Sequence, residues 1–458
     1  MNSHIFREYD IRGIAETDLS DDVARAIGRS YGSVVRGDSD GARVAVGRDG
    51  RLSSPRLSRA LTEGINSAGV DVVDVGLVPT PCLYHTIHHL GVDGGVMVTG
   101  SHNPGHMNGF KLSKGTASIY GEAITDLERR IRESELASGG GEREEIDGLT
   151  PYLAALASRI ELARPLKIVL DAGNGSGGPA AEEFLRGLGV DLIPLFCEPD
   201  GSFPNHPADP TVLSNLDDLI RTVRETGADL GIGLDGDADR VGVVDNLGRV
   251  LWGDRLLALF ARELLGGAHP GAPVIFEVKC SQALVEDIEA HGGRPIMWKT
   301  GHSLIKSKMK ETAAPLAGEM SGHMFFADEY FGYDDGIYAA GRIARLLAGD
   351  SRPLSEIADT VPNYSCTPEL RVECADSRKF AVVDEVLDHF RDGREVVDID
   401  GARILFGDGW GLVRASNTQP VLVLRFEART PDRMREIAAE VLSFLGGLDG
   451  VDVSSVEL

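Results

Sequence analysis

Three aspartates alternate along the segment DGDADR, where Asp235, Asp237 and Asp239 follow an apolar run. An extended loop can bring such carboxylates together, but like charges repel at short range unless a cation neutralises them. Hard divalent cations prefer oxygen ligands of this kind. The calcium loop of an EF-hand is not matched, because Arg240 and Asn246 stand where it needs Gly and Glu. The segment therefore predicts a divalent-metal site beside a guanidinium suited to an anion, with a solvated acidic turn as the alternative.

A serine follows another apolar run in the segment TGSHNP, with Gly100 before Ser101 and His102 after it. A serine where a strand passes into a loop is a candidate nucleophile. The hydrolase pattern GxSxG is absent, because position 103 is Asn. Lys111, ten residues further on in NGFKL, could return to the same site as a base or a phosphate-binding cation. An ordinary turn serine and a surface lysine are the alternatives.

The segment GEMSGH carries groups that suit sugar hydroxyls. Glu319, Ser321 and His323 alternate in GEMSGH, so one face presents a carboxylate, a hydroxyl and an imidazole to adjacent sugar hydroxyls. A polar loop with one satisfied histidine would look the same. Taken singly, Lys279 at the end of PVIFEVK and His302 in KTGHS are weaker signals.

The segment RASNTQP combines a guanidinium fork, two hydroxyls and an amide in Arg414, Ser416, Asn417 and Thr418. These groups suit a phosphate dianion. A hairpin turn without function is the alternative, because Ser, Asn and Thr favour turns in any case.

A glycine-rich segment supports a competing interpretation. Gly173, Gly175 and Gly178 in GNGSGG match the dinucleotide pattern GxGxxG after a strand, and Glu198 follows about 20 residues later. Asp171 at the start of the loop would face a pyrophosphate unfavourably, and a glycine-rich turn packed against the sheet fits equally well. A nicotinamide (NAD) dehydrogenase is therefore the second hypothesis.

The length, net charge and cysteine content of the chain limit the kinds of molecule that it is expected to bind. The 458 residues suffice for roughly two to four domains, and the formal charge of −25 repels nucleic-acid phosphates and anionic lipid surfaces. The five cysteines are an odd number without a CxxC pair, which is typical of reduced thiols. The first 13 residues carry charges where a signal peptide needs an apolar stretch. We expect a cytoplasmic protein with no nucleic-acid or membrane partner.

The sequence repeats one pattern of predicted strands and helices three times. The β-branched runs at 43–49, 167–173 and 273–279 each predict a buried parallel strand, followed by an amphipathic helix and a second strand. Gly69, Gly189 and Gly292 predict the helix ends. A third apolar run then precedes each of the segments TGSHNP, DGDADR and GEMSGH. Ligands collect at the carboxyl ends of strands in such sheets, so these segments should line a ligand site.

We therefore predict an α/β protein in which three similar βαβ-type mixed-sheet domains and a smaller C-terminal α+β domain surround a central active-site cleft. The glycine- and charge-rich stretch 135–148 marks the first boundary. The predicted domains are 1–147 with the serine loop, 148–250 with the metal loop, 251–362 with the sugar loop, and 363–458 with the phosphate loop.

Taken together, TGSHNP at 99, DGDADR at 235, GEMSGH at 318 and RASNTQP at 414 resemble the alpha-D-phosphohexomutase family, in this order and at these spacings. The similarity covers essentially the whole chain. KTGHSLIK at 299 and FGYDDGIYAA at 331 look most like the phosphomannomutase/phosphoglucomutase branch. Met320 disfavours the phosphoglucosamine branch, which is the alternative within the family. One departure is 105–107, where relatives often carry Pro-Asp-Tyr.

The resemblance implies an enzyme that moves a phosphoryl group reversibly between O1 and O6 of mannose or glucose phosphates, through a phosphoserine and a 1,6-bisphosphate. The phosphate on Ser101 would complete a Mg²⁺ site with Asp235, Asp237 and Asp239. Glucose 1,6-bisphosphate or mannose 1,6-bisphosphate would serve as intermediate and activator. Hexose phosphates are the expected partners, and a monomer is the expected state.

The resemblance also assigns roles to single residues. Catalytic roles fall to Ser101, His102, Lys111, Arg240 and His302, with Lys111 as the general acid/base at the accepting hydroxyl. Glu319 and Ser321 would hold O3 and O4 of the sugar. The other substrate-binding residues would be Tyr9, Arg12, Lys279, His323, Arg414, Ser416, Asn417 and Thr418. Besides the dehydrogenase, a cation-binding protein without catalytic activity stays open.

Overall fold

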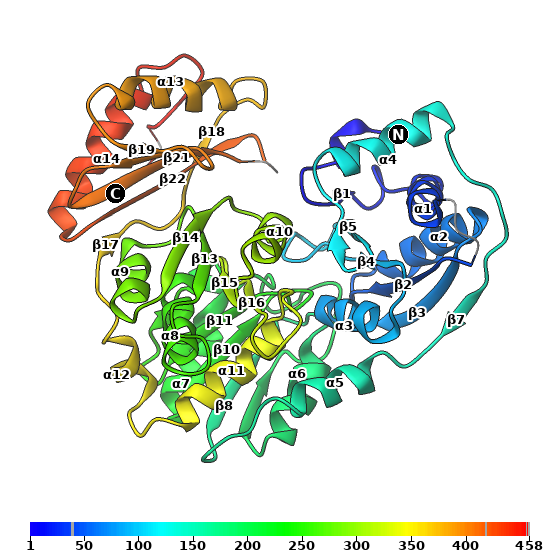
Figure 1. The fold of residues 1–458 in the computed structure, drawn as a ribbon, viewed down its shortest axis with the longest axis horizontal. Coiled ribbons are helices and arrows are strands. Elements are labelled where there is room, and N and C mark those ends of the chain that lie inside the picture. The colour runs from blue at the N-terminus through cyan, green and yellow to red at the C-terminus, as the bar shows by residue number, and fades with distance from the viewer. Residues whose placement is uncertain (38–40, 417–418, 455, 457–458) are drawn as a thin grey trace. The chain divides into compact units, whose positions relative to one another are not determined.

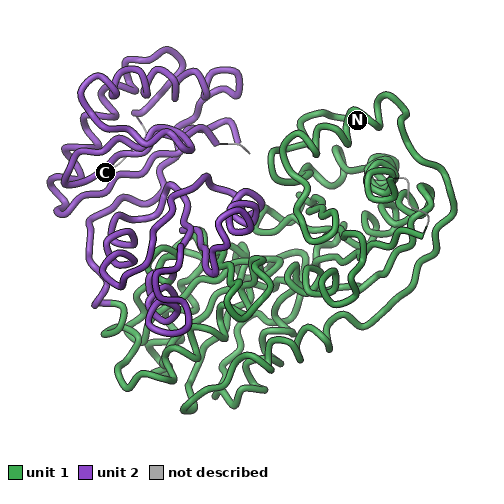
Figure 2. The backbone as a smooth tube through the Cα atoms, viewed as in Figure 1, with its two compact units in different colours: residues 1–256, 321–358 green, residues 257–320, 359–458 purple. Residues whose placement is uncertain are grey.

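The structure is a computed structural model that describes residues 1–37, 41–416, 419–454 and 456. These residues form two compact units (Figure 2): unit 1 comprises 1–256 with 321–358, and unit 2 comprises 257–320 with 359–458. The strands of the described residues form four sheets. The predicted class, three α/β domains with mixed sheets and a smaller α+β domain, is confirmed. Each unit takes in more than one of the four predicted domains, whose boundaries stay a prediction.

The first sheet of unit 1 has the strand order β1-β5-β4-β2-β3-β7, with β6 paired to β5 (Figure 1). Its strands are β1 (Ile11–Ile14), β2 (Arg43–Arg48), β3 (Asp71–Leu77), β4 (Gly94–Val98), β5 (Met107–Lys114), β6 (Ala117–Ser118) and β7 (Arg143–Glu145). The accompanying helices are η1 (Ser3–Ile5), α1 (Asp21–Arg36), α2 (Ser54–Ser67), α3 (Thr80–Leu90) and α4 (Glu122–Glu133). Strand β2 runs parallel to both β3 and β4, whereas β5 is antiparallel to β4 and β1.

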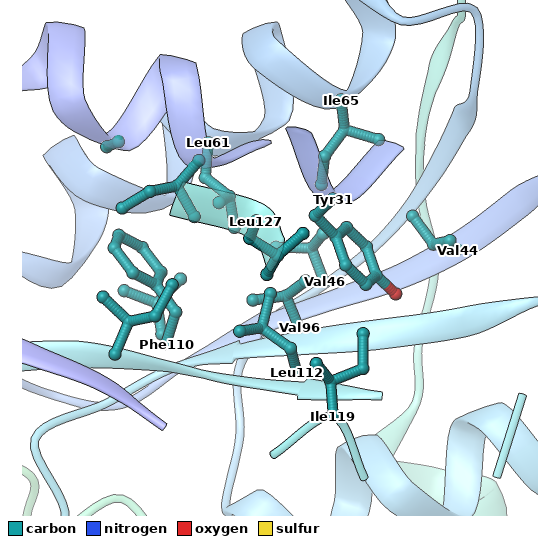
Figure 3. Close-up of a cluster of buried hydrophobic side chains, with 14 of the residues drawn as sticks. Tyr31, Val44, Val46, Leu61, Ile65, Val96, Phe110, Leu112, Ile119 and Leu127 are labelled. Atoms are coloured by element: carbon teal, nitrogen blue, oxygen red, sulfur yellow. The ribbon is translucent and has the colours of Figure 1, made fainter. Parts of the chain in front are cut away.

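An apolar core packs these helices onto the sheet. Figure 3 shows Tyr31 of α1 and Leu61 of α2 gathered with Val46, Val96 and Phe110 of the strands, all buried. The Tyr31 hydroxyl donates to the carbonyl oxygen of Ser113 at 2.6 Å, which satisfies its one polar group. The core anchors β4 and β5, and these two strands carry the serine loop between them.

The second sheet of unit 1 has the order β12-β11-β10-β8-β9. Its strands are β8 (Lys167–Asp171), β9 (Asp191–Leu195), β10 (Leu230–Leu234), β11 (Val241–Asp245) and β12 (Val250–Leu251). The other elements of this unit are α5 (Leu149–Ala157), α6 (Gly178–Gly187), η2 (Leu213–Leu216), α7 (Asp217–Thr226), β16 (Met324–Phe326), α11 (Gly336–Ala348) and α12 (Leu354–Ala358).

In unit 2, β13 (Pro273–Glu277) lies between two parallel partners, β14 (Arg294–Trp298) and β15 (Leu316–Gly318). The helices of this part are α8 (Gly253–Gly266), α9 (Gln282–Ala290) and α10 (His302–Thr312). The C-terminal part is an antiparallel sheet of order β17-β22-β21-β20-β19, with β18 also paired to β22. Its elements are β17 (Ser365–Cys366), β18 (Leu370–Glu373), α13 (Lys379–Arg391), β19 (Val396–Val397), β20 (Ala402–Leu405), β21 (Gly409–Ala415), β22 (Val421–Ala428) and α14 (Pro431–Leu445).

The threefold repeat predicted from the sequence is present. In each copy a central strand, β2, β8 or β13, pairs in parallel with the strands that the second and third apolar runs form. Three glycines, Gly69, Gly189 and Gly292, each directly follow the C-cap residue of a helix. The φ angles of these glycines lie between 77° and 85°. That left-handed conformation favours glycine, which is why the helices end there.

The glycine- and charge-rich stretch 135–148 is more than a linker. Its residues Arg143–Glu145 form β7, which pairs in parallel with β3 at the edge of the first sheet. Arg143 binds Asp74 of β3 with a 2.7 Å ion pair, and this contact ties the stretch to the sheet. No helix among the described residues has the length and apolar character needed to span a membrane.

A histidine fixes the long connection that follows β9. His206 Nε2 lies 3.1 Å from Oδ2 of Asp171, the last residue of β8. The hydrogen bond to this buried carboxylate raises the pKa of His206. The same connection offers the carbonyl oxygen of Ala208 to the amide of Gly236, so the histidine helps to position the DGDADR loop.

We predict that His206→Gln destabilises the protein at pH 6 and has little effect at pH 9. Because the pKa of His206 is raised on folding, the pair stabilises the fold fully below the unfolded value of 6.5 and this stabilisation is lost as pH rises through the folded value. Urea unfolding of wild type and variant across this pH range measures the difference. Equal destabilisation at both pH values would contradict the prediction.

Candidate active site

The serine loop meets the acidic loop in unit 1. Ser101, three residues beyond β4, donates its hydroxyl to Asp235 Oδ2 at 2.8 Å, although 134 residues separate the two in the chain. The Oγ atom also lies 3.1 Å from His102 Nδ1. Ser101 adopts φ 49°, an uncommon value for a residue other than glycine, and its amide donates to Thr99 Oγ1 at 2.8 Å. The backbone thus turns so that the hydroxyl points at the carboxylates.

The three aspartates of the acidic loop lie together in the protein interior. Asp235, Asp237 and Asp239 are fully buried, and one carboxylate oxygen of each lies within 4.8 Å of the others. Burial and the charge of Asp237 raise the pKa of Asp235. Among the described residues, Oδ1 of Asp237 and Oδ1 of Asp239 are buried without a hydrogen-bond partner. Buried oxygens of this kind fit a hard divalent cation, so the donor set matches the metal expected from the sequence.

Lys111 of β5 reaches the same carboxylates from the first sheet. Its Nζ lies 2.7 Å from Asp237 Oδ2 and also contacts Asp239 Oδ2. Burial alone would lower the pKa of Lys111, but the neighbouring carboxylates outweigh burial and raise it. Lys111 is therefore a cation at neutral pH and not the surface lysine of the alternative interpretation.

Thr80, at the start of α3, also binds the acidic loop, although no motif in the sequence indicated this contact. Its hydroxyl donates to Asp237 Oδ2 at 2.5 Å, and its amide donates to the Asp237 carbonyl at 2.9 Å. Only its position just beyond the end of β3 could have indicated this role.

Arg240 connects the acidic loop to His323. Its amide donates to Asp235 Oδ1 at 3.2 Å, and its Nε donates to His323 Nε2 at 2.9 Å. Because Nε2 accepts, the imidazole proton sits on Nδ1, which lies 3.0 Å from Asp334 Oδ2. Asp334 belongs to the FGYDDGIYAA segment, where sequence analysis assigned it no function. Ser321 lies in the same unit, two residues before this histidine.

Two other predicted residues contribute to the electrostatics of unit 1. Burial lowers the pKa of His102, and the charges of Arg240 and Arg12 lower it further, so His102 is neutral at neutral pH. Arg12 lies on β1 opposite Gly109 of β5 and binds Asp10 with a 2.7 Å ion pair. Tyr9 lies half-buried in the turn that leads into β1.

Unit 2 holds the other predicted substrate residues, and carboxylates pair with the cations among them. Lys279 Nζ lies 3.1 Å from Glu369 Oε2, and Arg414 Nε donates to Asp400 Oδ2 at 2.7 Å. The charge of Lys279 lowers the pKa of Glu369 to about 2. Neither carboxylate could be recognised from the sequence, because a single acidic residue at a distant position carries no signal of its partner.

A hydrogen bond joins the segments that carry Glu319 and His302 in unit 2. Glu319 Oε1 accepts from the amide of Gly301 at 2.7 Å, and His302 follows as the first residue of α10. Ser416 is buried just beyond β21. Asn417 and Thr418 lie outside the described residues.

The glycine-rich segment packs against the acidic loop. A Cβ added at Gly177 would lie 2.3 Å from Cβ of Ala238, and one at Gly175 would lie 2.8 Å from the carbonyl oxygen of Gly236. The amide of Ser176 donates to the same carbonyl at 3.0 Å. These glycines permit a close approach of two loops, so the segment is the packed glycine-rich turn that the sequence offered as the alternative to a dinucleotide site.

Fold and site together define a multidomain α/β enzyme in which a serine hydroxyl faces a buried acidic loop. Four family models match the chain in order. They are the Phosphoglucomutase/phosphomannomutase alpha/beta/alpha domains I (residues 3–138), II (150–248) and III (252–364), and the C-terminal domain (369–443).

Individual relatives agree with the family models. The phosphomannomutase/phosphoglucomutase of Pseudomonas aeruginosa PAO1 is 47% identical over 448 residues, which cover 97% of this chain and 96% of the relative. The phosphoglucomutase of Neisseria gonorrhoeae is 44% identical, with 94% and 95% covered. A phosphoglucomutase/phosphomannomutase family protein from Burkholderia thailandensis, solved by X-ray crystallography, aligns with a TM-score of 0.92 at 44% identity, covering 98% of this chain and 99% of its own. The chain belongs to the phosphoglucomutase/phosphomannomutase family of alpha-D-phosphohexomutases.

We predict that Gly177→Ala destabilises the fold by about 1–3 kcal/mol and weakens Mg²⁺ binding, because the new methyl group displaces Ala238 and with it the acidic loop. Gly187→Ala in α6 is the matched control, since nothing lies within 4 Å of its added Cβ. Thermal unfolding with and without Mg²⁺ measures both effects. A Gly177→Ala protein that behaves like the control would contradict this account of the segment.

We predict that Glu369→Gln lowers the unfolding free energy by about 1–3 kcal/mol at pH 7. The pKa of Glu369 is lowered on folding, from 4.5 to about 2, so its stabilisation is present above 4.5 and is lost as pH falls through the folded value. The difference between wild type and variant should therefore shrink between pH 5 and pH 3. Denaturant unfolding at these pH values tests it, and a difference independent of pH would be inconsistent with the ion pair.

Proposed function

We propose that the protein transfers a phosphoryl group reversibly between O1 and O6 of a hexose phosphate, with mannose and glucose phosphates as substrates. The observation that carries the proposal is the 2.8 Å contact between the Ser101 hydroxyl and Asp235, beside two buried carboxylate oxygens that lack a hydrogen-bond partner among the described residues. A phosphoserine at this position would place its anionic oxygens next to the acidic loop only if cations balance the charge.

In the proposed reaction, phosphorylated Ser101 donates its phosphoryl group to the free hydroxyl at O1 or O6. The bond between Oγ and phosphorus breaks and the new bond between phosphorus and the sugar oxygen forms. The sugar hydroxyl gives up its proton, and Ser101 Oγ takes up one proton to become a hydroxyl again. The resulting 1,6-bisphosphate turns end over end and returns its other phosphoryl group to Ser101. His102, which is neutral and lies 3.1 Å from Oγ, can exchange a proton with the serine oxygen.

Cations surround the reacting phosphoryl group in this proposal. Mg²⁺ held by Asp235, Asp237 and Asp239 would neutralise charge on that group. Arg240 is oriented by His323 to meet the same anion. The raised pKa of Lys111 favours a role as a cation or proton donor over the role of base in the resting enzyme.

We assign the sugar and the second phosphate to the remaining predicted residues. Glu319 and Ser321 offer the carboxylate and hydroxyl that adjacent sugar hydroxyls need. His323 contributes to substrate binding through Arg240, because its two ring nitrogens face Arg240 and Asp334. The paired carboxylates of Glu369 and Asp400 hold Lys279 and Arg414 in fixed orientations, which reduces the entropy lost when a phosphate binds. The other assigned contacts are Tyr9, Arg12, His302, Ser416, Asn417 and Thr418.

We also propose an activator, a cellular location and an oligomeric state for the protein. Glucose 1,6-bisphosphate or mannose 1,6-bisphosphate would be both intermediate and activator. We place the protein in the cytoplasm as a monomer without nucleic-acid or membrane partners, which the acidic charge of −25 and the free cysteines of the described residues support.

We predict that Ser101→Ala abolishes turnover of mannose 1-phosphate and glucose 1-phosphate in coupled assays without added bisphosphate. Intact-mass spectrometry should show one phosphate on the wild type and none on the variant. Ser158→Ala, on an exposed helix end, is the control that keeps both properties. Activity of Ser101→Ala within about tenfold of wild type would overturn the nucleophile role, because the whole phosphoenzyme route passes through this oxygen.

We predict that chelation with EDTA stops turnover and that Mg²⁺ restores it. Mg²⁺ should also raise the melting temperature of the wild type, since a ligand that binds only the folded state stabilises it. Asp237→Asn should lose most of that shift because it removes one of the three carboxylates. Full activity in EDTA would refute the metal site.

A further inference from the structure

Four main-chain carbonyl groups of the serine loop converge on one guanidinium. Through Nη2, Arg51 donates to the carbonyl oxygens of Ser101 at 2.6 Å and Asn103 at 2.5 Å. Through Nη1, it donates to those of Pro104 at 2.7 Å and Met107 at 3.0 Å. The Arg51 side chain is 1% exposed. Because the five donors of a guanidinium lie in one rigid plane, these bonds define the path of the loop from 101 to 107.

A carboxylate holds the guanidinium and the other flank of the loop. Asp49, directly after β2, accepts from Arg51 Nε at 3.1 Å through Oδ2. The same oxygen accepts from the Thr99 hydroxyl at 2.8 Å and from the Gly100 amide at 3.2 Å. Thr99 Oγ1 in turn accepts from the amide of Ser101. The two side chains therefore bind the loop on both sides of the serine.

The carbonyl group of Ser101 packs closely against the acidic loop. A Cβ added at Gly236 would lie 2.4 Å from the carbonyl oxygen of Ser101, so that oxygen fits between Arg51 and the acidic loop. The guanidinium carbon lies 5.1 Å from the centre of the Phe203 ring. Ser101 itself keeps φ at 49°, a conformation that persists only where the surroundings impose it.

We propose that Arg51 is a positioning residue for phosphoryl transfer. Oriented by Asp49, it holds the serine loop in the one conformation that sets Ser101 Oγ against Asp235. The inference rests on the proposed function, and it adds a residue that touches neither substrate nor metal in that scheme. Positioning of this kind matters because a displacement of about 1 Å at a reacting atom can cost roughly a hundredfold in rate.

The test is Arg51→Lys, assayed with the full chain. An ammonium keeps the charge but is a point donor, so it cannot bind four carbonyl groups in one plane. We expect kcat to fall by about tenfold or more while KM changes by less than about threefold, because the substrate contacts are untouched. We also expect faster hydrolysis of the phosphoserine, measured by loss of one phosphate in intact-mass spectra over time.

The matched control is Arg36→Lys. Arg36, the last residue of α1, also donates to two main-chain carbonyl oxygens, those of Ala68 and Ser138, each at 3.1 Å. The same substitution there should leave kcat and phosphoserine lifetime unchanged. The proposal is overturned if Arg51→Lys keeps kcat within about twofold of wild type, or if both variants lose kcat equally.

A second pair of variants covers the case in which Arg51→Lys does not fold. Thr99→Val removes the oxygen that links Ser101 to Asp49, and Thr99→Ser retains it. We expect kcat to fall in the valine variant and to return in the serine variant. A wild-type kcat in Thr99→Val, or a kcat that does not recover in Thr99→Ser, would argue against the proposal that Asp49 and Arg51 position the serine loop.

Amide hydrogen exchange separates this proposal from the proposed function. Exchange in residues 100–107 should be faster in Arg51→Lys or Thr99→Val than in Arg36→Lys. If the wild type fails to interconvert hexose phosphates but this difference persists, the proposed function fails and the positioning role stands. If the wild type is active and exchange in the loop is unchanged, Arg51 does not hold the loop.

Discussion

Three carboxylates buried within 4.8 Å of one another form the constraint on which the rest of unit 1 depends. Such a cluster is stable only when positive charge lies among it, because the interior screens repulsion poorly. The fold supplies Lys111 from β5 and Arg240 from the loop itself, and two buried oxygens remain for a divalent ion. In the proposed reaction, a phosphate on Ser101 would add negative charge that the same cations must balance.

Close packing of the backbone places the serine loop against the acidic loop. Gly175 and Gly177 carry no side chain where two loops of the second sheet approach each other, and Gly236 carries none where the acidic loop approaches the serine loop of the first sheet. The buried ion pair of Asp49 and Arg51 then holds the serine loop by its carbonyl groups. Because the Arg51 side chain is buried and held by Asp49, its hydrogen bonds suit a hydroxyl that must stay aligned with its acceptor.

Opposite charges are also paired in unit 2, at the residues that we propose to bind the second phosphate. Lys279 and Arg414 are paired with Glu369 and Asp400, so each cation is oriented before any anion arrives. A phosphate that binds these cations would form charge-assisted hydrogen bonds without first ordering flexible side chains.

The sequence by itself determined the repeated strands, the ends of three helices and the positions of Ser101 and the acidic loop, because periodicity and glycine placement are local properties. It left the glycine-rich segment ambiguous, since a turn packed on a loop and a turn packed on a pyrophosphate need the same residues. It gave no sign of Thr80, Glu369 or Arg51, whose partners lie far away in the chain. Only the tertiary structure decided these contacts, because a hydrogen bond or ion pair depends on which loops the sheets bring to one edge.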